Sequence, residues 1–183
     1  VKVIERLISL LKVILENRQN LKIFQDTTLL MKQGQELANL GNWQWDIFHN
    51  IVKWSESLYD IYGVDKNSFV STFEGYLELI HPEDRKMVVK RIQNTLKTKH
   101  DTTFEERIIR PDGEIRYLKS WCKVVLDEND KVTELIGACL DITEIKTVQL
   151  KLAKNKLLYK NLVEELKISN ERYEYVNKAT NDA

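Results

Sequence analysis

The chain has 183 residues, of which 43% are hydrophobic, and this is enough for one domain of ordinary size with helical extensions. Its 28 basic and 28 acidic side chains balance, so the overall charge does not favour nucleic acid or anionic lipid as a partner. The two cysteines, Cys122 and Cys139, lack the spacing of a metal or disulfide site, which predicts buried thiols in a reducing compartment.

The most apolar run, residues 3–15, carries three charged side chains and is shorter than the roughly 20 apolar residues that a membrane span needs. The sequence shows no signal peptide. We therefore expect a cytoplasmic chain without direct membrane insertion, whether or not its parent protein is membrane-anchored. Because the chain starts at Val1 and stops at Ala183 within a helical pattern, we expect it to be a piece of a longer protein.

The first 33 residues have the spacing of a packed or coiled helix. Its apolar side chains recur at three- and four-residue steps: Ile4, Leu7, Leu11, Ile14 and Leu21. This pattern predicts a docked helix without a site of its own. Residues 35–40 predict a short amphipathic helix, which Gly41 would end in the left-handed conformation.

Two strands, residues 42–48 and 51–54, and three helices follow. Ser55 is a good N-cap for a helix over residues 56–62, which Gly63 would close. Ser71 or Thr72 would begin a second helix, reaching residue 78. His81 and the proline after it would introduce a third, over residues 85–97.

Residues 107–145 organise the rest of the chain. Turns at residues 110–113 and 127–130 separate β-rich runs at residues 104–109, 115–126 and 131–142. These runs predict three consecutive antiparallel strands. Strands, then short helices, then strands indicate an α+β domain with an antiparallel sheet.

A heptad pattern begins immediately after the last strand and continues for about five repeats. One seam position holds Ile145, Leu152, Tyr159, Leu166 and Tyr173, and the other holds Val148, Asn155, Leu162, Ser169 and Val176. The pattern predicts a coiled coil, parallel or antiparallel, against the alternative of one helix packed on its own domain. The polar residues Asn155 and Ser169 would lower stability and select the register.

The assembled pattern resembles a PAS sensor domain of the subgroup with a PAC-type second half. The matching residues are Gly41-Asn42-Trp43-Gln44-Trp45-Asp46, Trp54-Ser55, Tyr59-Asp60-Ile61-Tyr62-Gly63, His81-Pro82-Glu83-Asp84-Arg85, Arg110-Pro111-Asp112-Gly113, Gly137 and Asp141-Ile142-Thr143. The resemblance implies a five-stranded sheet of order 2-1-5-4-3 with helices on one face around a small cavity. It also implies a module of bacterial sensors, in particular histidine kinases of two-component systems, and of cyclic-dinucleotide enzymes.

The resemblance extends weakly to both ends of the chain. Residues 171–183 resemble the lead-in helix of a PAS domain, so we expect a second such domain to follow. The N-terminal helix resembles the closing helix of a preceding sensor module, such as a GAF domain. We therefore divide the chain into a linker helix (1–34), a PAS domain (35–145) and a coiled-coil linker (146–183).

Side chains that either line or fill the cavity are the candidate ligand-binding residues: Trp45, Trp54, Tyr59, Trp121 and Cys139. We favour a filled or nearly filled interior, because the strands supply bulky aromatics and few polar anchors. Haem and a flavin–cysteine adduct are not expected, since residues 85–97 contain no histidine and both cysteines lie on strands. No metal cluster, phosphate loop or catalytic triad is evident, so we expect no cofactor, metal or enzymatic activity.

The junction of the last strand and the outgoing helix, Asp141-Ile142-Thr143, is the candidate signal relay. Asp141 would cap the helix or pair with a cation from the first strand or its flank, while Ile142 anchors the junction. The leading interpretation is a non-catalytic PAS relay module that forms a homodimer through its flanking helices, between sensor and output domains of the same chain. The alternatives are a small-molecule receptor and a structural spacer.

Overall fold

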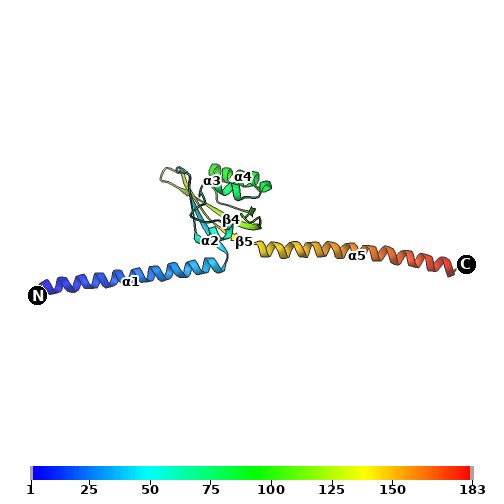
Figure 1. The fold of residues 1–183 in the computed structure, drawn as a ribbon, viewed down its shortest axis with the longest axis horizontal. Coiled ribbons are helices and arrows are strands. Elements are labelled where there is room, and N and C mark those ends of the chain that lie inside the picture. The colour runs from blue at the N-terminus through cyan, green and yellow to red at the C-terminus, as the bar shows by residue number, and fades with distance from the viewer. Residues whose placement is uncertain (1, 182–183) are drawn as a thin grey trace. The chain divides into compact units, whose positions relative to one another are not determined.

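The computed structural model describes residues 2–181, which divide into one unit ending at Asp141 and another beginning at Ile142. Its elements, shown in Figure 1, are α1 (Lys2–Leu37), β1 (Leu40–Asp46), β2 (Ile51–Trp54), α2 (Glu56–Tyr62), α3 (Phe73–Leu79), α4 (Pro82–Thr98), β3 (Thr102–Ile109), β4 (Ile115–Leu126), β5 (Val132–Asp141) and α5 (Thr143–Asn181).

The five strands form one antiparallel sheet in the order β2-β1-β5-β4-β3, which confirms the predicted fold. Turn chemistry explains the two C-terminal hairpins. Gly113, at φ +87°, and Asp130, at φ +61°, take left-handed conformations in the loops after β3 and β4. Asp127 accepts hydrogen bonds from the amides of Asn129 and Lys131, which closes the second loop.

The three short helices between β2 and β3 begin and end at capping residues. The Ser55 and Thr72 hydroxyls accept hydrogen bonds from the first turns of α2 and α3, and Gly63 ends α2 at φ +68°. His81 is the N-cap of α4, where its Nδ1 accepts from the amide of Glu83, with Pro82 in the first turn. These caps agree with the sequence analysis.

The N-terminal helix differs from its prediction. α1 continues through Gly34 to Leu37, because Gly34 is exposed and a glycine inside a helix costs only about 1 kcal/mol. The left-handed residue after the helix is Asn39, at φ +51°, and Gly41 instead lies in β1. The apolar spacing at the start of this helix involves Ile4 and Leu7, whose side chains lie outside the described ones.

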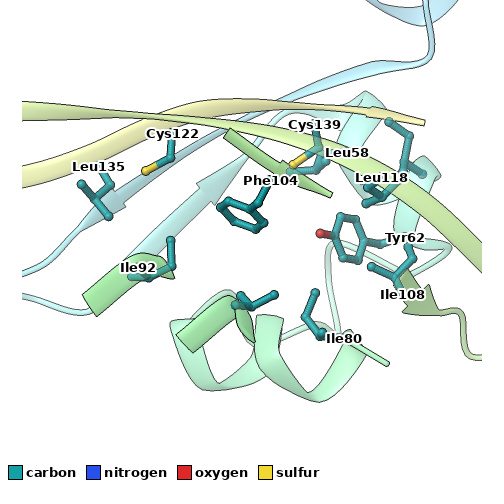
Figure 2. Close-up of a cluster of buried hydrophobic side chains, with 12 residues drawn as sticks. Leu58, Tyr62, Ile80, Ile92, Phe104, Ile108, Leu118, Cys122, Leu135 and Cys139 are labelled. Atoms are coloured by element: carbon teal, nitrogen blue, oxygen red, sulfur yellow. The ribbon is translucent and has the colours of Figure 1, made fainter. Parts of the chain in front are cut away.

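The domain core lies between the sheet and its helices, and Figure 2 shows the buried cluster. Two glycines allow this packing. A Cβ on Gly41 would lie 2.6 Å from the Leu58 side chain, and one on Gly137 would lie 2.0 Å from the Trp121 carbonyl oxygen and 2.5 Å from the Trp43 ring. Helix α2 therefore packs against β1 at Gly41, and the Trp43 ring lies against β5 at Gly137. A larger residue at either position would clash.

The second unit contains α5, a single helix of 39 residues. Its first turn includes a hydrogen bond from the Lys146 amide to the Ile142 carbonyl. The side chains of Tyr173 and Val176, at the far end of the predicted seam, lie outside the described ones. So do residues 182–183 of the lead-in pattern at 171–183.

Candidate functional site

A cavity of about 40 Å³ lies on the inner face of the sheet. Its wall consists largely of aromatic and aliphatic side chains from β1, β2, α2, α3, α4 and β3. The lining residues are Trp43, Trp45, Val52, Trp54, Leu58, Tyr62, Phe73, Tyr76, Ile92, Phe104, Ser120 and Cys139.

Three of the five predicted lining residues lie in this wall, namely Trp45, Trp54 and Cys139. Tyr59 lies outside it, packs its ring 5.3 Å from that of Trp54 and shares a hydrogen bond of 3.0 Å with Ser71. Trp121 does not face the cavity, because side chains alternate along β4 and its neighbours Ser120 and Cys122 are the buried ones. It faces the other side of the sheet, with the Lys119 ammonium over its ring.

Aromatic packing fixes the shape of the cavity. Trp45 stacks on Phe73 with ring centroids 4.6 Å apart, and Trp54 lies 4.6 Å from Tyr62. Trp43 and Phe73, which the sequence analysis did not select, belong to the same wall as Trp45. The alternation of Trp43 with Trp45 was the available signal, since it places both rings on one face of β1.

A buried polar chain adjoins the cavity. The Ser120 hydroxyl donates to Oε1 of Glu106 at 2.6 Å and lies 3.1 Å from the Cys139 thiol. Glu106 is only 2% exposed, and within the described part of the chain its Oε2 has no hydrogen-bond partner. The Tyr62 hydroxyl, which points toward Phe104 in Figure 2, interacts with the thiol of Cys139 as well.

Burial dominates the protonation of this chain. Loss of water raises the pKa of the Glu106 carboxyl to about 8, although the hydrogen bond from Ser120 opposes the shift. Burial likewise raises the pKa values of the Cys139 thiol and the Tyr62 hydroxyl. At neutral pH the buried groups of Glu106, Cys139 and Tyr62 are therefore uncharged. Sequence analysis missed Glu106, although it alternates with Phe104 and Ile108 on the inward face of β3.

The predicted relay residues end the sheet and begin the last helix. The Asp141 carboxylate, whose side chain is 6% exposed, accepts a hydrogen bond of 2.7 Å from Nη1 of Arg116 on β4. The sequence analysis predicted a cation from β1 or its flank, and this was wrong, because the cation comes from β4. The residue before β1 supplies a backbone contact nearby, through the Asn39 carbonyl that accepts from the Asp141 amide. Ile142 is buried, and Thr143 is the first residue of α5.

A second ion pair joins α4 to the sheet. Arg107 on β3 donates to both carboxylate oxygens of Asp84 in the first turn of α4, at 2.9 and 2.6 Å. This guanidinium lowers the pKa of the Asp84 carboxyl. The contact ties the first turn of α4, the helix that supplies Ile92 to the cavity wall, to β3.

Comparison with known families identifies this domain. Residues 51–139 match the family model described as the PAS fold, which covers the region from β2 through most of β5. The chain contains a PAS domain.

The PAS domain has curated relatives in signalling proteins. Over 123 residues the chain is 28% identical to the probable diguanylate cyclase DgcE of Escherichia coli, a match that covers 67% of this chain and 11% of that protein. Over 114 residues it is 31% identical to a blue-light-activated histidine kinase of Brucella ovis, covering 62% of this chain and 22% of that protein. The chain thus spans a small part of the length of these relatives.

Solved structures share the PAS fold. A sensory box histidine kinase/response regulator from Burkholderia thailandensis superposes with a TM-score of 0.58 at 20% identity, covering 69% of this chain and 96% of that one. The N-terminal domain of a diguanylate cyclase with a PAS/PAC sensor, from Marinobacter aquaeolei, gives 0.55 at 21% identity and covers 58% of this chain and 98% of that one. At these identities the likeness establishes the fold.

The long helices before and after the PAS domain in the sequence, α1 and α5, carry exposed apolar side chains. On α5 the six apolar residues predicted for the seam are each more than half exposed: Ile145, Val148, Leu152, Tyr159, Leu162 and Leu166. Asn155, also exposed, lies among them. In residues 2–181, no helix has the length and apolarity to cross a membrane, and no group of three or more His, Cys, Asp or Glu side chains could hold a metal ion.

Proposed function

We propose that this chain is a PAS relay module of a multidomain bacterial signalling protein, in which α5 pairs with α5 of a second copy and carries conformational change toward an output domain. The exposed heptad of α5 is the observation that carries this proposal. Apolar side chains that remain in water along one helix are stabilised when a second helix buries them. The relatives in histidine kinases and a diguanylate cyclase support the signalling role.

Parallel pairing follows from Asn155. In a parallel coiled coil the same seam position of both helices meets, so two Asn155 side chains can hydrogen-bond to each other. An antiparallel arrangement would place Asn155 opposite a residue of the other seam position, so the two Asn155 amides would not meet. The parallel dimer therefore suits two PAS domains that deliver a signal to one output.

The relay itself begins at the ion pair of Asp141 and Arg116. Only Ile142 separates the end of β5 from the start of α5 along the chain, so a change in the position of Asp141 is passed on within two residues. The Asp141 side chain is only 6% exposed, and replacing Arg116 would remove a charge-assisted hydrogen bond from its carboxylate. We infer that this contact sets how α5 enters its pairing.

Disulfide trapping tests both parts of the proposal. In the chain carrying Val148→Cys, mild oxidation should link two copies, whereas Lys154→Cys, which lies off the seam, should link them slowly. Adding Arg116→Met to Val148→Cys should change the trapping rate several-fold, while Lys66→Met, which removes an exposed ion pair with Glu56, should not. Equal trapping at positions 148 and 154 would contradict the seam, and an unchanged rate in the Arg116 variant would contradict the relay.

A second candidate function, a receptor for a small molecule, is favoured by the cavity and by the unpartnered Oε2 of Glu106 near it. A volume of about 40 Å³ is far below the roughly 300–1,000 Å³ of typical ligand pockets, so any ligand held without rearrangement is very small. The relay and receptor roles are compatible, because a ligand that binds one arrangement of the domain more tightly shifts its population.

A further inference from the structure

The cavity combines two features that suit one kind of ligand. Three tryptophans, two tyrosines and two phenylalanines make up most of its wall. Aromatic rings present a negative face that attracts cations, above all when the site is closed to water. The wall contains no lysine, arginine or histidine, so no basic side chain there would pair with an anion.

The second feature is the acidic residue behind this wall. Ser120 lines the cavity and donates its hydroxyl proton to Oε1 of Glu106. With its proton committed to the carboxyl group and the Cys139 thiol able to donate to it, the Ser120 oxygen retains one lone pair that can accept a hydrogen bond from a ligand. The other carboxyl oxygen, Oε2, lacks a partner among the described residues, and a buried polar atom without a partner is costly.

These observations favour a cation over other ligands. A neutral hydrocarbon would leave the Ser120 oxygen of the wall unused, and an anion would meet aromatic rings with the Glu106 carboxyl group behind Ser120. We propose that the cavity binds a small organic ammonium ion, with the rings of the wall around its charge, Ser120 accepting an N–H hydrogen bond and Glu106 as the counter-charge. This inference rests on the receptor role and does not depend on pairing of α5.

Size restricts the ligand further. Since one water molecule needs about 10–15 Å³ of such space, the cavity of about 40 Å³ holds about three non-hydrogen atoms. Ethylammonium has this size and is the natural probe. A ligand of three non-hydrogen atoms makes few contacts, so its dissociation constant is expected in the millimolar range.

Proton linkage gives the site a signature. The carboxyl group must ionise to act as a counter-charge, and Glu106 holds its proton below about pH 8. Five other titratable groups act on Glu106 and its buried neighbours, namely Tyr62 of α2, Tyr76 of α3, Cys122 of β4, Cys139 of β5 and Asp84 of α4. Burial raises the pKa values of the first four, and Arg107 lowers that of Asp84, so all five keep one protonation state between pH 6 and 8. The affinity for ammonium ions should therefore rise by up to about tenfold per pH unit over this interval.

The experiment is a ligand-observed NMR titration of the 183-residue chain with ethylammonium chloride, at constant ionic strength and at pH 6, 7 and 8. Ethanol serves as the uncharged probe of equal size. We expect millimolar binding of ethylammonium that strengthens with pH, and binding of ethanol at least tenfold weaker at pH 8. Glu106→Gln should weaken ethylammonium binding at least tenfold and remove its pH dependence.

The matched control is Glu105→Gln, which changes the exposed neighbouring glutamate on the same strand and should leave binding unchanged. Equal binding of ethanol and ethylammonium would overturn the ammonium assignment while leaving a receptor role. Binding of neither probe would overturn both. The comparison of the two probes and the pH series use the unmodified chain, so they decide the matter even if the Glu106 variant does not fold.

Discussion

The PAS domain and α5 contain similar proportions of apolar side chains but place them differently. In the domain, Leu58, Ile80, Val88, Ile108, Leu118 and Leu135 are at most 1% exposed. On α5, the six apolar seam side chains that the structure describes are each more than half exposed. The domain therefore obtains its hydrophobic stabilisation within one chain, whereas α5 requires burial against something else to obtain any.

This difference can be measured separately in the two regions. All four tryptophans lie between residues 43 and 121, so tryptophan fluorescence reports on the domain. Far-UV circular dichroism is dominated by the two long helices, since α1 and α5 contain 36 and 39 residues. Substitutions in one region should move one signal and leave the other in place.

The largest effect is expected at Gly137. In Gly137→Val the new side chain would overlap the Trp121 carbonyl and the Trp43 ring, and the domain should lose about 3 kcal/mol or more of its free energy of unfolding. Urea denaturation followed by tryptophan fluorescence measures the loss. Gly34→Ala is the control, because a Cβ at Gly34 meets nothing within 4 Å and should stabilise α1 by about 0.5–1 kcal/mol. A Gly137 variant as stable as the original chain would contradict the close packing of Trp43.

The next effect concerns pH and Glu106. The pKa of this carboxyl is about 8 in the folded domain and near its ordinary value of 4.5 when unfolded, so the unfolded chain releases the proton first. Stability from the buried neutral acid is complete below about pH 4.5 and is lost as pH rises toward 8. Between pH 5 and 7 the free energy of unfolding should fall by about 2–3 kcal/mol from this group.

Glu106→Gln should remove this slope, and Glu105→Gln should keep it, as measured by urea denaturation across the pH range. A slope that survives in the Glu106 variant would show that another group causes it. Loss of the slope in the Glu106 variant alone would show that the domain interior carries a titratable acid near neutral pH. A purely apolar core would have no such slope.

The smallest effect is expected at Asn155. Replacing it with leucine adds an apolar seam side chain, so Asn155→Leu should tighten the association of α5 about tenfold and raise the thermal midpoint of the helical signal. The fluorescence transition of the domain should stay in place. A lower helical midpoint in this variant would exclude position 155 from the seam.

Much of the fold could be predicted from the sequence because it depends on local signals. Ser55, Gly63 and Thr72 mark helix ends by capping, and Gly113 marks a hairpin turn, so the elements between them fell within a few residues of their true bounds. Gly34 misled the prediction of α1, since an exposed glycine weakens a helix without ending it.

The site was less predictable, because it depends on which strands are neighbours and on which face each side chain lies. Trp121 was assigned to the cavity by residue type, although alternation along β4 places it on the opposite face. Arg116 could not be matched to Asp141 before β4 and β5 were known to pair with Leu118 opposite Asp141. Glu106 was overlooked because a glutamate in a strand is ordinarily exposed.

The seam on α5 can be tested most directly by sedimentation equilibrium of the whole chain. We expect the unmodified chain to be a dimer and the double variant Leu152→Lys, Leu162→Lys to be a monomer with unchanged tryptophan fluorescence. The double variant Thr147→Lys, Asn161→Lys adds the same charge away from the seam and should remain dimeric. A monomeric unmodified chain, or a dimer that survives both seam lysines, would contradict pairing through α5.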